Sequence, residues 1–526
     1  MKEIIESGGC CLGIEFGSTR IKSVLVDEKG DPIAAGSYSW ENEFDNGIWT
    51  YDLNSVRKGL QESYNALVWD VYEKYGAKIS NLKAIGISAM MHGYMAFDDE
   101  DFLLAPFRTW RNTITEEASA ALTKAFKFNI PQRWSIAHLY QAILKGEEHL
   151  KRIHYLTTLA GYVHWKLTGE RVLGIGDASG MFPIDNRTLD YNSDYVDIFD
   201  DMIADYDLGW KLRDILPKVM VAGEKAGVLT EEGAAFLDKS GNLNPGIALC
   251  PPEGDAGTGM VATNSVAERT GNISAGTSIF AMVVMEHALK GVHEEIDVVT
   301  TPEGKDVAMV HCNNCTSDIN AWADLFKGYS KAMGYGVDND KLYETMFRSA
   351  LGGDYDCGGL MGFNYFSGEP VTDFEQGRPV FIRGINSNFT FENFMRLHLY
   401  SAVSTLKYGL DILFKEEDAG IDKMYGHGGF FKTKEAGQRI MSAAIGGPVT
   451  VMNTAGEGGA WGIAVLAMYM AEENKKSLSE YLKEVIFSDE TGEEIMASDE
   501  EIAGFDKFMS RFIAAFSVER AAIDYV

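Results

Sequence analysis

One aspartate is placed where a carboxylate could do acid–base chemistry. Asp255 lies in the segment PPEGDAGTGMVAT (251–263), where a loop becomes an expected helix and the following residues are small. The start of a helix attracts anions, and a carboxylate held there can act as a general base towards a bound ligand. The same position is also typical of an N-cap, whose side chain only closes the end of the helix. Spacing alone leaves both interpretations open.

Two turns of small residues offer backbone N–H groups to an anion. The segments LGIEFGSTRIKSVLV (12–26) and NISAGTSIFAMVV (272–284) both have alternating apolar residues on each side of a turn, which predicts two β-hairpins. The turn residues are Gly17, Ser18 and Thr19 in the first segment and Gly276, Thr277 and Ser278 in the second. Successive turn amides bind anions, and Lys22 adds a cation near the first turn. An ordinary hairpin explains either turn alone, but a matching pair favours a polyphosphate ligand.

Two glycine-rich loops could also contact a ligand. GHGGFFK (426–432) and AGEGGAWG (455–462) each precede an expected helix. Glycine lets flat rings and phosphates approach the backbone, so both loops could bind a nucleotide. Each loop is explained equally well as a glycine-rich turn that only precedes a helix.

The elements that must position these groups alternate along the chain. Strands are expected at 32–38 and 82–88 and a helix at Leu53–Tyr75, and the second half has helical patterns at 391–414, 434–445 and 460–471. Strands that alternate with helices indicate an α/β protein. Because each half opens with a similar hairpin, we expect two similar domains, 1–267 and 268–526.

The composition excludes several classes of function. The chain has 526 residues, a net charge of −30 and 46% hydrophobic residues, which argues against disorder and against nucleic acid or anionic membrane as a partner. It has neither an apolar run of membrane-spanning length nor a secretory leader pattern. With only six cysteines, the sequence predicts a soluble cytoplasmic protein with reduced thiols. Cys312 and Cys315 have redox or zinc spacing, but a lone pair of this kind more often indicates packing.

Taken in order, these motifs resemble those of the FGGY family of carbohydrate kinases over nearly the whole chain. The segment 13–27 resembles the family's first phosphate hairpin, 253–263 the stretch with its catalytic aspartate, 271–280 its second phosphate turn and 426–449 its adenosine motif. The resemblance implies two ribonuclease-H-like domains of the actin/hexokinase type flanking a central cleft. It implies an N-terminal domain that binds the sugar and carries Asp255, and a C-terminal domain that binds ATP.

The resemblance also implies a set of ligand-binding residues. AMMHG (89–93) is similar to the Gln-Met-His-Gly segment of xylulokinases, and RTWRN (108–112) to a Trp-Asn-Asp-x-Arg-like stretch. Together with Asp255, the implied sugar site is Met91, His92, Trp110, Arg111 and Asn112. The implied nucleotide site is both phosphate turns, Lys22, Gly428, Gly429 and Lys432. Core packing is the alternative for the methionine, the histidine and the tryptophan.

The chain departs from the family at several of these positions. Glu15 stands where members usually have an aspartate that holds Mg²⁺ through water. Met90 replaces a glutamine, RTWRN lacks the aspartate, and the adenosine glycines are followed by Phe430, Phe431 and Lys432. These differences indicate a divergent branch, so the sugar should not be copied from xylulokinase.

The leading hypothesis is therefore ATP- and Mg²⁺-dependent phosphorylation of a ketopentose such as xylulose or ribulose. Asp255 would be the general base for in-line transfer of the γ-phosphate to a terminal hydroxyl. One alternative is a kinase for another sugar or a polyol. Another is a non-catalytic nucleotide-binding protein of the actin or Hsp70 kind. The sequence leaves a homodimer open.

Overall fold

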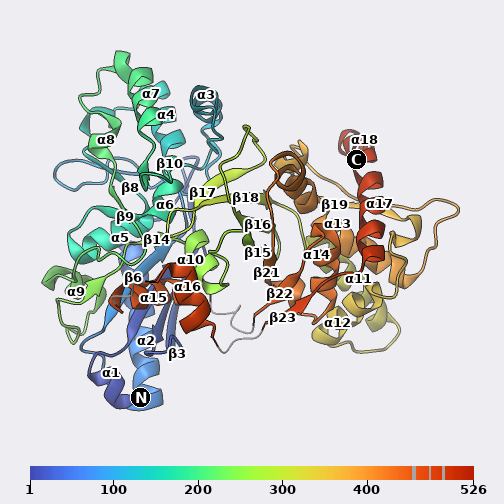
Figure 1. The fold of residues 1–526 in the computed structure, drawn as a ribbon, viewed down its shortest axis with the longest axis horizontal. Helices are drawn as coiled ribbons and strands as arrows, with labels where there is room; N and C mark the ends of the chain where they lie inside the picture. The colour runs from blue at the N-terminus through green and yellow to red at the C-terminus, as the bar shows by residue number, and fades with distance from the viewer. Residues whose placement is uncertain (453–457, 473–475, 489–491) are drawn as a thin grey trace. The chain divides into compact units, whose positions relative to one another are not determined.

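The computed structural model describes residues 1–452, 458–472, 476–488 and 492–526 (Figure 1). Contacts divide the chain into two compact units. The first unit comprises Met1–Val266, Asp297–Val307 and Glu457–Asp489, and the second comprises Ala267–Ile296, Ala308–Gly456 and Glu490–Val526. The chain first passes from one unit to the other at Val266, and two later segments return to the first unit.

Both predicted hairpins are confirmed. In the first unit β1 (Cys11–Phe16) and β2 (Arg20–Val26) pair antiparallel, and in the second unit β15 (Thr270–Ala275) pairs antiparallel with β16 (Ile279–Val284). The small residues of each motif form the connection between the two strands. Period-2 alternation on both sides of a short turn was sufficient to locate them.

A six-stranded sheet forms the centre of the first unit. Its order is β13-β6-β1-β2-β3, with β14 also paired to β6. The first three strands form an antiparallel meander, whereas β6 runs parallel to β1 and to the two later strands. The bounds are β3 Pro32–Ser39, β6 Ala84–Ala89, β13 Ala248–Leu249 and β14 Glu253–Gly254. The carboxyl ends of β6 and β14 therefore lie side by side, where ligand groups are commonly placed.

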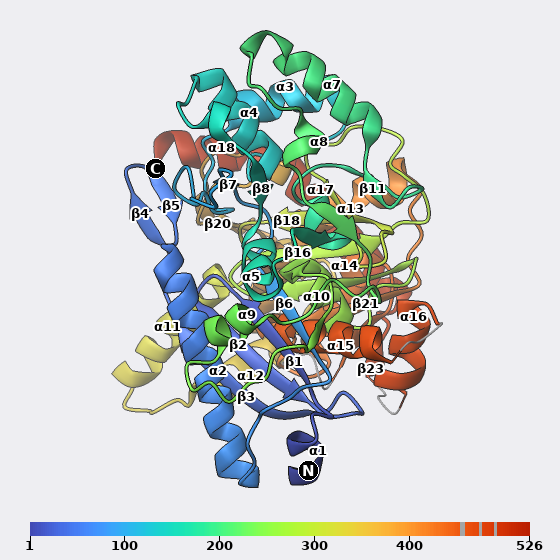
Figure 2. The ribbon, with the colours of Figure 1, turned by 90° about the vertical axis from the view of Figure 1, so that its left-hand side faces the viewer.

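Helices cover both faces of this sheet. The helix α2 (Leu53–Tyr75) has the predicted bounds and lies along β2 and β3 (Figure 2). The opposite face is covered by α15 (Gly458–Ala471). A Cβ on Gly13 would lie 2.0 Å from the carbonyl oxygen of Ala460, and one on Gly86 2.6 Å from that of Ile463. Glycine at these two sheet positions therefore lets α15 approach unusually closely.

Further helices of the first unit pack around this sheet or form its outer part. They include α3 (Glu116–Phe126), α4 (Ser135–Lys145), α5 (Leu159–Thr168), α6 (Ile175–Ser179), α7 (Ser193–Ile203) and α10 (Asp255–Ala262). The helix α10 packs against α15, and a Cβ on Gly462 would lie 2.1 Å from the carbonyl oxygen of Thr258. The two helices thus begin close to one another at the end of β1.

The second unit is built on a sheet in which the order runs β18-β16-β15-β21-β22-β23. The bounds are β18 Asp306–Cys312, β21 Lys423–His427, β22 Val449–Val451 and β23 Glu493–Ile495. As in the first unit, the first hairpin strand pairs parallel with a later strand, β15 with β21. Helices of this unit include α11 (Ser317–Ala332), α12 (Asn339–Ala350), α13 (Phe391–Asp411), α14 (Ala436–Ile445), α17 (Asp499–Ala514) and α18 (Phe516–Tyr525).

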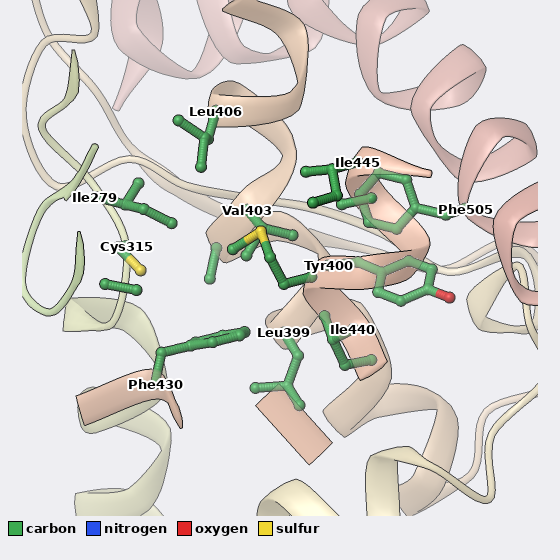
Figure 3. Close-up of a cluster of buried hydrophobic side chains, with 14 of the residues drawn as sticks. Ile279, Cys315, Leu399, Tyr400, Val403, Leu406, Phe430, Ile440, Ile445 and Phe505 are labelled. Carbon is green, nitrogen blue, oxygen red and sulfur yellow. The ribbon is translucent and has the colours of Figure 1, made fainter. Parts of the chain in front are cut away.

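The buried helix α13 is the centre of the second unit's core. Its side chains Leu399 and Val403 point into a cluster in which Ile279 and Cys315 lie on one side and Phe505 on the other (Figure 3). The predicted helix at 391–414 runs through α13 into a wider π-type turn at Ile412–Glu416. The helical periodicity was therefore correct, although the last turn is not α-helical.

The cysteines take part in packing. All six are free and buried, and Cys312 and Cys315 belong to the core of the second unit. Burial raises the pKa of both thiols, so they stay protonated at neutral pH. The place of both side chains in this core agrees with the packing interpretation of the pair. Among the described helices, none is both long and apolar enough to cross a membrane.

Candidate active site

Asp255 is the first helical residue of α10, and it does not cap that helix. Gly254 is the N-cap and receives no side-chain bond, so the N-cap interpretation of Asp255 is wrong. The carboxylate instead accepts a hydrogen bond at Oδ1 from the backbone N–H of Met91, at 3.1 Å. Asp255 is exposed, but enough protein surrounds its carboxylate to raise the pKa of Asp255 to about 6. Backbone N–H groups of Met91 and of Ala256 act in the opposite direction and lower this pKa.

The segment after β6 reaches this aspartate because two glycines leave a slot for Met91. A Cβ on Gly254 would lie 2.2 Å from Met91 Cγ, and a Cβ on Gly180 would lie 2.8 Å from Met91 Cε. Met91 is 6% exposed, so its side chain packs in this slot. The packing fixes the backbone N–H that holds Asp255.

His92 adopts an uncommon backbone conformation beside the same slot. Its φ is +68°, a left-handed value that few non-glycine residues adopt, and strain of this kind often marks a functional position. Its Nδ1 lies 3.0 Å from the carbonyl oxygen of Gly180, and its ring stacks at 6.1 Å on Trp134. Burial, assisted by the charge of Arg133, lowers the pKa of His92 to about 3.

These contacts assign the tautomer of His92. Because a carbonyl oxygen only accepts, Nδ1 must carry the proton of the neutral ring, which leaves Nε2 as an acceptor. Nε2 has no hydrogen-bond partner within the described residues. A ligand hydroxyl that reached this atom would find an acceptor at any physiological pH.

The segment 108–112 attaches to a small hairpin, β4 (Glu43–Asp45) and β5 (Ile48–Thr50), and to the first turn. Asn112 is buried and clamps Trp49, accepting from its N–H at 2.8 Å and donating to its carbonyl at 2.8 Å. Arg111 lies over the Trp49 ring, 4.1 Å from its centroid. Trp110 is 38% exposed and donates from Nε1 to Ser18 Oγ at 3.3 Å. The structure therefore joins this segment to the first turn, and it records no contact between Asn112 and Asp255.

Glu15 and Lys22 face each other across β1 and β2. They are paired in register, which places their side chains on the same face of the sheet. Glu15 Oε2 accepts a hydrogen bond from Ala460 N–H at the start of α15, at 3.2 Å. Burial, and next the negative charge of Asp255, raise the pKa of Glu15 to about 7. A Cβ on Gly459 would lie 2.3 Å from Glu15 Oε1, so only glycine leaves space beside that oxygen.

Two further carboxyl groups lie beneath Asp255. Glu253 accepts hydrogen bonds from the N–H groups of Gly176 at 3.3 Å and Asp177 at 2.9 Å. Asp177 accepts at Oδ2 from Thr158 Oγ1 at 2.6 Å. Burial is the main cause that raises the pKa of Asp177 to about 7 and that of Glu253 to about 8, and each pKa is raised further by a neighbouring carboxyl. No local pattern marks Glu253 in the sequence, since only the fold brings it to α6.

The first turn and the second turn both present free amides. The N–H groups of Ser18 and Thr19 in the first unit, and those of Thr277 and Ser278 in the second, have no acceptor in the described part of the chain. Thr19 and Thr277 are exposed. Each turn therefore has N–H groups that can donate to an anion.

The glycine loop after β21 lies against the end of β15. Gly428 has φ +100°, and a Cβ there would lie 2.4 Å from the carbonyl oxygen of Ala275, so only glycine fits. Gly429 has open space around it, and Lys432 is exposed. Phe430 and Phe431 are buried and anchor the loop in the core. Part of the other expected glycine loop, 455–457, lies outside the described residues.

The first unit thus brings together an exposed carboxylate, a histidine with an open acceptor, an acidic and a basic side chain in register, and a turn with free amides. Such a set can activate a hydroxyl group and hold a phosphorylated ligand. The second unit carries the other turn and the glycine loop. Trp134, on which the His92 ring stacks, is not marked by any local sequence pattern.

Comparisons with known proteins relate most of the chain to one family. Two family models match the chain: "FGGY family of carbohydrate kinases, N-terminal domain" over residues 10–244 and the C-terminal domain of the same family over residues 271–471. Xylulose kinase of Haemophilus influenzae is 22% identical over 473 residues, covering 85% of this chain and 91% of that protein.

Solved structures show the same fold. Ligand-bound xylulose kinase from Lactobacillus acidophilus superposes with a TM-score of 0.78 at 17% identity, covering 97% of this chain and 98% of that one. Gluconate kinase from the same organism superposes with a TM-score of 0.76 at 17% identity, covering 96% and 97%. The predicted fold of two α/β domains of the actin/hexokinase type is confirmed.

Proposed function

Because this chain belongs to the FGGY family of carbohydrate kinases, we propose that it phosphorylates a ketopentose such as xylulose or ribulose with ATP. The first unit binds the sugar and supplies the base, and the second binds the nucleotide. The observation that carries the proposal is the Asp255 carboxylate, which is exposed and is held at one oxygen by the loop that contains His92.

Asp255 acts as the general base. It takes the proton of a terminal sugar hydroxyl while the hydroxyl oxygen attacks the γ-phosphorus, the bond to the bridging oxygen breaks, and ADP leaves. A base works best when its pKa lies near the working pH, and Asp255, with a pKa of about 6, is closer to neutrality than an ordinary aspartate. The N–H of Met91 keeps the carboxylate in a fixed orientation for this transfer.

The sugar is bound by the segments around His92 and Trp110. His92 accepts a hydrogen bond from a sugar hydroxyl at Nε2, and Met91 contacts the sugar carbons. Arg111 and Trp110 line the pocket, and Asn112 supports it by fixing the backbone of β5. The similarity to xylulose kinases supports a ketopentose as the substrate.

Phosphate oxygens of ATP are bound by the amides and hydroxyls of the two turns. In the first unit these belong to Gly17, Ser18 and Thr19, with Lys22 adding positive charge. In the second unit they belong to Gly276, Thr277 and Ser278, and Gly428, Gly429 and Lys432 bind the rest of the nucleotide. Free amides and small residues at both turns support this assignment.

The residues present also fit Mg²⁺. The charge of Asp255 contributes to the raised pKa of Glu15, an effect that a cation would relieve, and Gly459 leaves space at Glu15 Oε1. Mg²⁺ keeps several waters and needs only one or two carboxylates, so the absence of a larger ligand cluster in the described residues is no obstacle. We propose that Glu15 holds the hydrated ion, which neutralises phosphate charge when bound.

The proposal is tested by ADP release with Mg²⁺ and ATP over xylulose, ribulose, gluconate, glycerol and no acceptor. Release that requires a ketopentose supports it. Release with only gluconate or glycerol would move the substrate to another sugar or polyol, as the similarity of the fold to gluconate kinase permits. ATP binding without acceptor-dependent release would favour a non-catalytic nucleotide-binding protein.

A further inference from the structure

The two turns share a feature that neither turn's own sequence contains: each turn carbonyl is held by a donor from elsewhere. In the first unit Gly17 O accepts from Trp40 Nε1 at 2.7 Å, and Ser18 O accepts from the Tyr51 hydroxyl at 2.5 Å. Thr19 O accepts from the backbone N–H of Trp40 at 3.1 Å. The carbonyl oxygens of all three turn residues therefore accept hydrogen bonds.

The second unit repeats this pattern with different donors. Gly276 O accepts from Thr316 Oγ1 at 2.8 Å and from Thr316 N–H at 3.1 Å. Thr277 O accepts from Cys315 N–H at 2.9 Å. The donors of both units thus bind the first and second carbonyl of the turn.

Holding a carbonyl fixes the N–H of the same peptide unit. In a planar trans peptide the C=O and the next N–H point in opposite directions. The bond from Trp40 to Gly17 O therefore orients the N–H of Ser18, and the bond from Tyr51 to Ser18 O orients the N–H of Thr19. In the second unit the bonds from Thr316 and Cys315 orient the N–H groups of Thr277 and Ser278 in the same way.

None of these four N–H groups has an acceptor within the described residues. If a turn peptide rotated, it would present a carbonyl oxygen to the phosphate and repel it. We propose that Trp40, Tyr51 and Thr316 are positioning residues, whose side-chain donors keep the amides of both turns directed at the phosphates of a nucleotide. This inference rests on the proposed binding of ATP.

The surroundings suit such a role. Trp40 is 7% and Tyr51 2% exposed, and their rings stack at 4.0 Å with an angle of 21°. Burial raises the pKa of Tyr51, so its hydroxyl keeps the proton that it donates. Tyr51 directly precedes Asp52, the N-cap of α2, which fixes its backbone. A donor held this firmly limits the movement of the turn it contacts.

Conservative substitutions test the proposal by nucleotide affinity, measured calorimetrically with ATP, ADP and AMP. Tyr51→Phe removes one hydroxyl and keeps the stacked ring. Thr316→Val removes the hydroxyl of the second unit, and Thr316→Ser restores it. The matched control is Tyr75→Phe, which loses a similar bond, Tyr75 to Ile33 O at 3.1 Å, at the far end of α2.

We expect Tyr51→Phe and Thr316→Val each to weaken ATP and ADP binding about fivefold to tenfold, the effect of losing one hydrogen bond. AMP affinity and the KM for the sugar should stay within twofold of the parent values, and Thr316→Ser and Tyr75→Phe should bind ATP normally. Thermal unfolding of every variant shows whether it is folded, and the second-unit pair carries the test if Tyr51→Phe is unstable.

Two outcomes would overturn the inference. One is ATP affinity in Tyr51→Phe and Thr316→Val equal to that of Tyr75→Phe, and the other is equal weakening of AMP, which indicates a general loss of structure. A parent protein that binds no ATP would instead overturn the proposed function, so the two failures are distinguishable.

Discussion

At the scale of single residues, the candidate site depends on side chains whose positions are set by backbone contacts. Asp255 is oriented by the N–H of Met91, and His92 by the carbonyl of Gly180. Both partners are main-chain groups, so substituting Asp255 or His92 leaves the partner group itself in the chain. This makes the two positions suitable for substitution experiments.

Asp255→Asn should reduce turnover by about 10²–10⁴-fold, the usual contribution of a general base. The amide oxygen can still accept from Met91 N–H, so ATP and sugar affinity should change only a few fold. Steady-state kinetics with the best acceptor measures turnover, and calorimetry measures affinity. Near-normal turnover would remove Asp255 from the role of base.

His92→Ala should reduce kcat/KM for the sugar by about 10²-fold while the KM for ATP hardly changes, because a hydroxyl of the sugar would lose its acceptor. The matched control is His164→Ala, since His164 is also buried and also bonds a backbone carbonyl, Ala226 O at 2.9 Å. If both variants lost activity and thermal stability to the same degree, His92 would be a core residue only.

At the scale of elements, β14 and α6 meet through the buried pair of Glu253 and Asp177. The folded pKa values, about 8 and about 7, lie above the ordinary 4.5 and 3.8, so the folded chain binds more protons than the unfolded chain between these limits. The pair therefore lowers the free energy of unfolding least below about pH 4, and this loss of stability grows as the pH rises towards about 8.

Glu253→Gln should expose this slope. Its melting temperature relative to the parent should rise steadily between about pH 5 and pH 8, because glutamine carries no charge to bury. The variant also loses one bond to the N–H groups of α6, a cost that does not depend on pH. Glu73→Gln on the exposed face of α2 is the control, and its difference from the parent should be flat. If the difference in melting temperature between Glu253→Gln and the parent did not change with pH, ionisation of Glu253 would not affect stability.

Elements and their order were largely predictable from the sequence, whereas their contacts were not. Alternation located both hairpins, and α2 begins and ends where its apolar spacing predicts. The bond from Ala460 to Glu15 joins residues at opposite ends of the chain, and no local pattern reports such a pairing. By spacing Asp255 was compatible with an N-cap, but Gly254 occupies that position. The Asp255 carboxylate instead accepts a hydrogen bond from the backbone N–H of Met91, a residue far away in the sequence.

At the scale of the whole molecule, the net charge of −30 repels every anionic ligand. Salt screens this field, with a Debye length of about 10 Å at 0.1 M. The KM for ATP should therefore fall as a neutral salt is raised from about 10 mM to about 150 mM, while the KM for an uncharged sugar should not change. Parallel changes in both constants would indicate a general effect of salt on the enzyme.

The close packing of α15 against Gly13 and Gly86 has a consequence for the synthesis and folding of this chain. Ribosomes deliver β1 and β6 early, but the helix that covers their glycine face begins only at Gly458. Until then the nascent first unit exposes apolar sheet surface, which favours association with chaperones or with other chains. A polypeptide released near residue 267 would keep that face uncovered permanently, so the first unit should not accumulate in folded form unless the segment Glu457–Asp489 is supplied.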